Sequence, residues 1–174
     1  MKINNNYCAA KGITFLLLLL VLQACGGITA YSVYKNAKGK DKTLVLSLIH
    51  QTKPERIQEI VSADAQQQVL LLRSEYEIIA KRLGVDVQTY RNNQIRRVQT
   101  ATVMYSDDYT RGIFTDKGRI YIKYGEPDSV KEEIDNTLGQ LEIWNYKNPD
   151  KQFVFLIKEH RVFKLYNLSE EDMF

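Results

Sequence analysis

Near the middle of the chain, the spacing of the apolar residues changes from a helical period to an extended one. Up to about Asp108, apolar side chains recur every three or four residues, as in helices that bury one face. Beyond that point they alternate with polar residues, as in strands. Helices followed by strands indicate an α+β fold. We therefore expect a helical hairpin packed on an antiparallel sheet of three to four strands.

Helix-end residues divide the first half of the chain into three helices. Pro54 can occupy the first turn of a short helix. Asp64, in the sequence Ser-Ala-Asp, can cap a longer helix over Ala65 to Leu83, which Gly84 would end in the left-handed conformation. Asp86 can cap a third helix that finishes near residues 106–108.

The faces of the two long helices are also predicted. Leu70, Leu71 and Ile78 broaden the apolar face of the helix over residues 65–83, which indicates burial on more than one side. In the next helix we expect a solvated face that carries three arginines, Arg91, Arg96 and Arg97.

Several segments have the composition of strands. Thr43 to Ile49 reads as a short buried strand that either pairs with Ile28 to Tyr34 or follows a flexible tether. In the second half, three runs joined by short turns predict a meander: Gln140 to Lys147, Gln152 to Lys158 and Arg161 to Tyr166. Residues 126–139 read as a loop with some extended character, although Ser129 to Glu132 could start one helical turn and Val130 to Ile134 could extend a strand.

The first 24 residues have the pattern of a signal peptide. Two lysines, Lys2 and Lys11, precede an apolar run over Ile13 to Leu22 that is short for a membrane span. The run ends in Leu-Gln-Ala-Cys-Gly, which resembles the lipobox of bacterial lipoproteins. That resemblance implies cleavage before Cys25, a palmitate-type lipid on Cys25, a tether over residues 25–42 and a single domain over residues 43–174. The alternative is an ordinary secretory signal with an incidental cysteine.

The sequence after Cys25 and the charge balance limit where the protein acts and what it binds. The four residues just after Cys25, Gly-Gly-Ile-Thr, include no aspartate and no acidic cluster, which by the lipoprotein resemblance implies the outer membrane with the domain facing the periplasm. Without residues 1–24, 22 basic residues face 21 acidic ones, so nothing favours nucleic-acid binding. The rest of the domain contains no cysteine. We predict neither a disulfide nor a metal or other cofactor.

Residues 111–130 join the helical half to the sheet. Thr115 to Gly118 reads as a turn, Arg119 to Tyr124 as a strand with alternating side chains, and Gly125 to Asp128 as a break. The stretch contains Gly-Ile-Phe-Thr-Asp, then Gly-Arg-Ile-Tyr-Ile and Tyr-Gly-Glu-Pro-Asp, and Glu-Ile-Trp-Asn-Tyr follows at residues 142–146.

These motifs resemble the GWxTD domain of bacterial envelope proteins, which is common in Bacteroidota and often found on lipoproteins. The resemblance covers about residues 92–166 and falls on eleven motif residues: Gly112, Thr115, Asp116, Gly118, Arg119, Tyr121, Gly125, Pro127, Asp128, Trp144 and Tyr146. Ile113 stands where the family has tryptophan, so a packing role survives there and a role special to the indole does not. The family implies a fold and a compartment, and no activity.

Two interpretations of the motif compete. In the first, its glycines, Thr115 and Asp116 serve local turns. In the second, Asp116, Glu126 and Asp128 converge as a carboxylate cluster for hydrolysis or cation binding. We expect the first. The two histidines, His50 and His160, have no partner at metal-ligand spacing and are expected in solvated turns.

Aromatic residues offer a third hypothesis. Tyr121, Trp144 and Tyr146 could share a sheet face, either packed under the helices or exposed as a small-ligand or glycan surface. Packing under the helices is the expectation. Taken together, the sequence predicts a non-enzymatic outer-membrane lipoprotein that binds a partner protein of the envelope and is held to the membrane by its N-terminal lipid.

Overall fold

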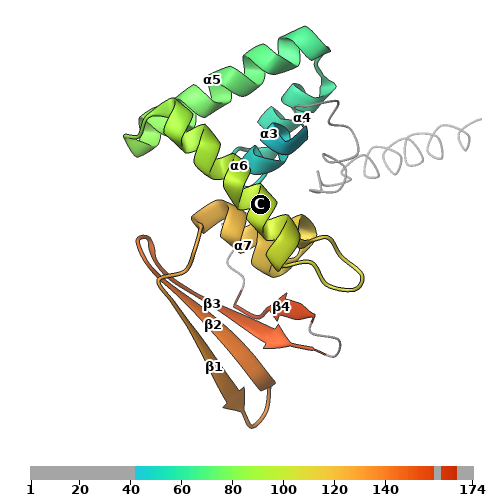
Figure 1. The fold of residues 1–174 in the computed structure, drawn as a ribbon, viewed down its shortest axis with the longest axis vertical. Helices are drawn as coiled ribbons and strands as arrows, with labels where there is room; N and C mark the ends of the chain where they lie inside the picture. The colour runs from blue at the N-terminus through green and yellow to red at the C-terminus, as the bar shows by residue number, and fades with distance from the viewer. Residues whose placement is uncertain (1–41, 159–161, 168–174) are drawn as a thin grey trace, which may run out of the picture.

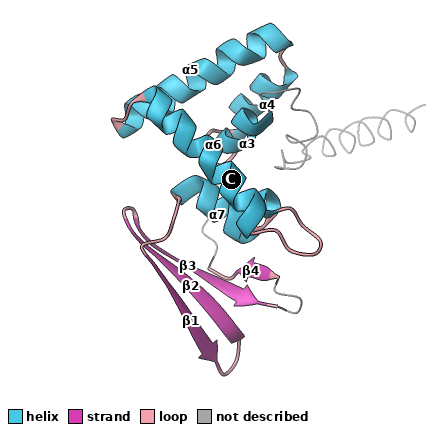
Figure 2. Ribbon diagram, viewed as in Figure 1, coloured by secondary structure: helices cyan, strands magenta, loops and turns pink. Residues whose placement is uncertain are grey.

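The computed structural model describes residues 42–158 and 162–167 and has helices at one end and a sheet at the other (Figure 1). The helical elements are α3 (Lys42–Leu48), α4 (Pro54–Ser62), α5 (Ala65–Leu83), α6 (Val87–Met104), the short 3-10 helix η2 (Gly112–Phe114) and α7 (Asp116–Tyr124). The strands are β1 (Ser129–Asp135), β2 (Gly139–Lys147), β3 (Asp150–Ile157) and β4 (Phe163–Leu165). The α+β class is confirmed (Figure 2). Cys25, the segment Ile28 to Tyr34 and His160 lie outside the described residues.

The helix ends lie where their capping residues predict them. Asp64 accepts a hydrogen bond from Gln67 N at 2.8 Å and Asp86 accepts one from Thr89 N at 2.8 Å, so each satisfies a free N–H of a first turn. Gly84 ends α5 with φ +67°. The α5–α6 hairpin is therefore confirmed, and it reaches the sheet through the end of α6 and through α7.

Helix α5 buries one side only, contrary to expectation. Leu70 is 62 % exposed and Ile78 is 55 % exposed, whereas Leu72, Tyr76 and Ile79 are buried against α3 and α4. Part of the broad apolar face of α5 is therefore exposed to solvent in the structure.

The predicted strand over Thr43 to Ile49 is wrong, because these residues form helix α3. Val45 and Leu48 pack into the cluster formed with α4 and α5, while Leu46 packs into a second cluster with α6 and Ile113. A short helix buried on two sides has an almost continuous apolar run, which periodicity cannot distinguish from a buried strand.

The predicted strand over Arg119 to Tyr124 is wrong for the same reason. These residues belong to α7, which lies between the other helices and the sheet (Figure 1). Ile120 packs with Trp144 and Phe155 of the sheet, whereas Ile122 packs with Val98 and Ala101 of α6. Two isoleucines that face opposite sides of a helix are two residues apart, which is also the period of a strand.

The sheet is a four-stranded antiparallel meander in the order β1-β2-β3-β4. The three predicted strands are confirmed, and Trp144 of β2 is the register partner of Phe153 of β3. Residues 129–135 form strand β1 rather than a loop, with Val130 opposite Trp144. The strand had little apolar signal because most of its residues are exposed at the sheet edge.

His50 is buried, with 7 % exposure, and is not the solvated turn residue that was expected. Its Nδ1 has no hydrogen-bond partner in the structure. Burial, with smaller contributions from Arg119 and Lys123, lowers the pKa of His50 from 6.5 to about 3. The imidazole is therefore neutral in the folded protein at neutral pH.

Mild acid is expected to destabilise the protein through His50. In the unfolded chain its pKa is ordinary, so between pH 6.5 and 3 the unfolded state binds a proton that the folded state does not. The free energy of unfolding should fall by about 2 kcal/mol from pH 7 to pH 5. Urea unfolding at both pH values measures the change. His50→Leu should remove most of it, and an unchanged pH dependence in that variant would contradict the assignment.

None of the helices in the described part of the chain combines the length and the apolar character that a membrane crossing needs.

Candidate functional site

The Gly-Ile-Phe-Thr-Asp motif forms a tight joint between α6 and α7. Gly112 lies against the last turns of α6, and a Cβ at this position would lie 1.8 Å from the carbonyl oxygen of Ala101. Gly112 N donates a hydrogen bond to Ser106 Oγ at 2.8 Å, and Ser106 Oγ donates to Thr102 O at 2.7 Å. Only glycine allows this approach of two backbones. Ile113, at the position of the family tryptophan, is buried in the α6 cluster.

Thr115 and Gly118 close the first turn of α7. Thr115 Oγ1 accepts from Gly118 N at 3.1 Å and donates to Gly112 O at 2.8 Å, so the residue is the N-cap of α7. A Cβ on Gly118 would lie 1.6 Å from the oxygen of Gly112. The predicted turn at residues 115–118 is therefore the start of a helix, and the local hydrogen bonding that was expected of Thr115 is present.

Asp116 connects this joint to the sheet. Its Oδ2 accepts a hydrogen bond from Leu165 N of β4 at 2.8 Å, and its Oδ1 contacts Arg119 at 3.2 Å. One carboxylate thus holds a strand edge 49 residues further along the chain.

The C-terminal end of α7 and the residue after it are held by side chains from α6, from β2 and from the turn that follows α3. Arg97 of α6 and Gln51 both donate to the carbonyl of Lys123, at 3.2 and 3.1 Å. Gly125 follows with φ +87°, and its carbonyl accepts from the Tyr146 hydroxyl at 2.9 Å. Burial raises the pKa of Tyr146, so the phenol remains a donor. Arg97 is therefore a structural donor and not, as predicted, part of a solvated face.

The three carboxylates of the cluster hypothesis have separate surroundings. Asp116 holds β4, whereas Asp128 Oδ2 accepts from Lys147 N of β2 at 2.7 Å. Glu126 is exposed beside Pro127, where the chain leaves α7 for β1. In the described ranges, no group of three or more histidine, cysteine, aspartate or glutamate residues is placed to hold a metal ion.

The aromatic residues of the motif belong to the core. Trp144 and Tyr146 are buried on the helix-facing side of β2, and Tyr121 lies on α7 rather than on the sheet. Tyr105, at the end of α6, contacts the rings of Tyr121 and Trp144 at centroid distances of 5.3 and 5.4 Å. An exposed aromatic sheet face for glycans is therefore not present at these residues.

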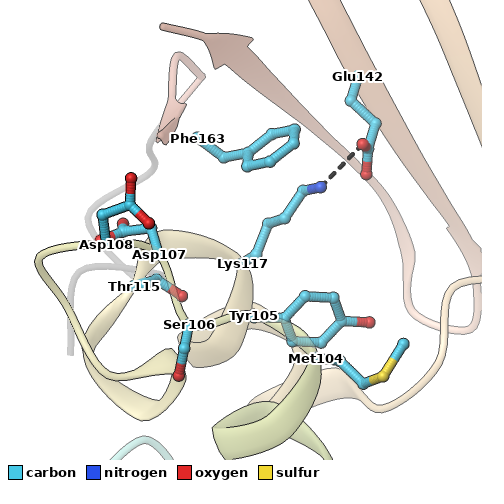
Figure 3. Close-up of a pocket in the computed structure, with 9 residues that line it drawn as sticks. All are labelled: Met104, Tyr105, Ser106, Asp107, Asp108, Thr115, Lys117, Glu142 and Phe163. Carbon is cyan, nitrogen blue, oxygen red and sulfur yellow. Dashed lines mark hydrogen bonds and ion pairs between the residues drawn. The ribbon is translucent and has the colours of Figure 1, made fainter. Parts of the chain in front are cut away.

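A buried ion pair that the sequence reasoning did not single out lies beside this aromatic core. Lys117 Nζ lies 2.8 Å from Glu142 Oε2 (Figure 3). Trp144 Nε1 donates a hydrogen bond to the other carboxylate oxygen of Glu142. The Lys117 ammonium also lies 3.2 Å from the centroid of the Phe163 ring. The one available signal was the alternation in β2, which places Glu142 on the same face as two buried aromatic residues.

The ion pair lines an open pocket of about 650 Å³ between the joint and the sheet (Figure 3). Asp107 and Asp108, in the loop after α6, border one end of it, and Met104 and Tyr105 border another side. A neighbouring pocket of about 310 Å³ shares Met104, Tyr105 and Glu142 in its walls. Burial raises the pKa of Tyr105 to about 12, so its hydroxyl is neutral at neutral pH.

The structure is a small α+β domain. Its Gly-Ile-Phe-Thr-Asp motif determines the backbone geometry of the joint between α6 and α7. A family model described as the GWxTD domain matches residues 34–173, and the chain belongs to that family. The match extends well beyond the 92–166 expected from the motifs. No curated protein and no solved structure shows significant similarity to the chain.

Proposed function

We propose that this GWxTD protein is a non-enzymatic lipoprotein of the outer membrane whose domain faces the periplasm and binds another envelope protein. The Leu-Gln-Ala-Cys sequence supports an anchor at Cys25. The motif supports a role other than catalysis, because Gly112 N and the side chains of Thr115, Asp116 and Asp128 form hydrogen bonds within the domain.

The observation that carries the binding proposal is the exposed apolar rim of the 310 Å³ pocket. Met104 of α6 is 66 % exposed and Val130 of β1 is 54 % exposed, and both line this pocket next to the buried Trp144. Apolar side chains at the mouth of an aromatic-floored pocket are typical of protein interaction sites.

Site-specific photo-crosslinking in cells tests this proposal. A photoreactive residue at Met104 should give a discrete crosslinked species of defined mass. The same residue at Leu70, which is equally exposed on α5, should not give that species. Equal crosslinking from the two positions, or monomer only from Met104, would contradict a partner at this rim.

The anchor is tested on the same strain. Incorporation of a palmitate analogue and sedimentation with outer membranes should both be lost in Cys25→Ala. Labelling that persists in this variant would place the lipid at another residue, and absence of labelling in the parent protein would contradict a lipid anchor.

A further inference from the structure

The two pockets that share Met104, Tyr105 and Glu142 form one groove along the helix-facing side of β2. We call their combined surface the groove. It extends from Pro127 and Val130 at one end, past Met104, to Asp107 and Asp108 at the other. Two adjoining open hollows suit successive side chains of an extended chain better than one compact ligand.

Trp144 gives the smaller hollow of the groove an apolar and rigid wall, whereas the Lys117–Glu142 ion pair lines the larger one. Trp144 is 2 % exposed, its indole N–H is bonded to Glu142, and its ring contacts Tyr105 and Phe155 at centroid distances of 5.4 and 5.0 Å. The exposed Met104 side chain stands at the junction of the two hollows. Methionine adapts its shape at little cost, so this position suits an aliphatic side chain from a partner.

The charge of the groove is negative, although the chain as a whole has 24 basic and 21 acidic residues. Four of its lining residues are acidic: Asp107, Asp108, Glu126 and Glu142. Among the described residues that line the two pockets, Lys117 is the one basic residue, and it lies 2.8 Å from Glu142. Three negative charges therefore remain, with Asp108 and Glu126 both exposed at the rim.

We propose that the groove binds an extended basic segment of the partner protein, with an aliphatic side chain at Met104 and lysine or arginine side chains beside Asp108 and Glu126. This inference rests on the proposed binding function and adds the chemistry of the partner. The acidic rim repels phosphate-bearing ligands and anionic lipid headgroups, whereas opposite charges at the rim of an apolar contact speed association and fix register.

Fluorescence anisotropy with labelled peptides tests the proposal on the full-length chain. The probes are a ten-residue peptide of alternating lysine and leucine, its glutamate–leucine counterpart, and a lysine–glycine peptide of equal charge. We expect the lysine–leucine peptide to bind more tightly than the other two. Charge reversal by the double substitution Asp108→Lys and Glu126→Lys should weaken its binding by at least about tenfold.

The matched control is the double substitution Glu55→Lys and Glu77→Lys, which makes the same change in net charge on α4 and α5. Equal weakening in both variants would show non-specific attraction and overturn the proposal. Tighter binding of the glutamate–leucine peptide, or no binding of the lysine–leucine peptide, would also overturn it. Thermal melts of each variant separate lost binding from lost folding.

The outcomes also distinguish this inference from the proposed function. A crosslinked partner at Met104 without peptide binding would support the proposed interaction and contradict a basic partner segment. Peptide binding that depends on Asp108 and Glu126, without a crosslinked species in cells, would support binding of basic segments by the groove and contradict a partner protein at Met104 in cells.

Discussion

Gly112→Ala is expected to lower the free energy of unfolding by about 4 kcal/mol or more, a large part of the stability of a domain of this size. The new Cβ would lie 1.8 Å from the carbonyl oxygen of Ala101 and 2.9 Å from Ser106 N, both of which are backbone atoms. Neither can move aside as a side chain can, so α6 and η2 must separate. Urea unfolding followed by circular dichroism measures the loss.

Gly84→Ala is the matched control for this substitution. Gly84 has φ +67°, yet a Cβ there meets nothing within 4 Å, so only the left-handed backbone opposes alanine. The cost should be about 1–2 kcal/mol. Equal destabilisation by the two substitutions would mean that the close approach at Gly112 is not what requires glycine.

Glu142→Ala is expected to cost about 3–5 kcal/mol, because it removes the carboxylate from a buried ammonium group. Lys117 and Glu142 are both less than 10 % exposed, and the change also removes the acceptor of Trp144 Nε1. Thermal and urea unfolding should agree on the loss. Fluorescence of the single tryptophan should shift as its indole N–H loses this acceptor.

The double substitution Lys117→Met and Glu142→Leu separates the effect of breaking the ion pair from that of lost packing. Replacing both partners by apolar side chains of similar size should recover most of the stability lost in Glu142→Ala. If the double variant is as unstable as the single one, the ion pair itself contributes the stability.

The elements with distinct ends or one exposed face could be predicted from the sequence. Asp64, Gly84 and Asp86 define α5 and α6 closely, because each satisfies a local backbone requirement. Strand β2 could be predicted from the alternation of its residues and its flanking turns, although both of its faces are buried over residues 141–144. The two segments wrongly predicted as strands are α3 and α7, which are short helices with neighbours on both sides. Burial on both sides removes the amphipathic pattern by which a helix is recognised.

The candidate site was less accessible to sequence reasoning than the fold. The predicted role of Thr115 and Asp116 in backbone hydrogen bonding is local and could be inferred. The partners of Asp116 and Lys117 are Leu165 and Glu142, respectively 49 and 25 residues away, and no local pattern encodes those pairs. The groove depends on the same long-range packing, so its residues could not be grouped before the structure.

The position of α7 has a consequence for how the molecule comes apart. A chain of helices followed by a separate meander could consist of two units that open independently. Here one nine-residue helix supplies a wall to both, through Ile120 on the sheet side and Ile122 on the helical side. The α6 cluster and the sheet core would therefore both lose a wall if α7 moved away. These two clusters should open together as one cooperative unit, whereas the cluster of α3, α4 and α5, which contains no residue of α7, keeps its own contacts.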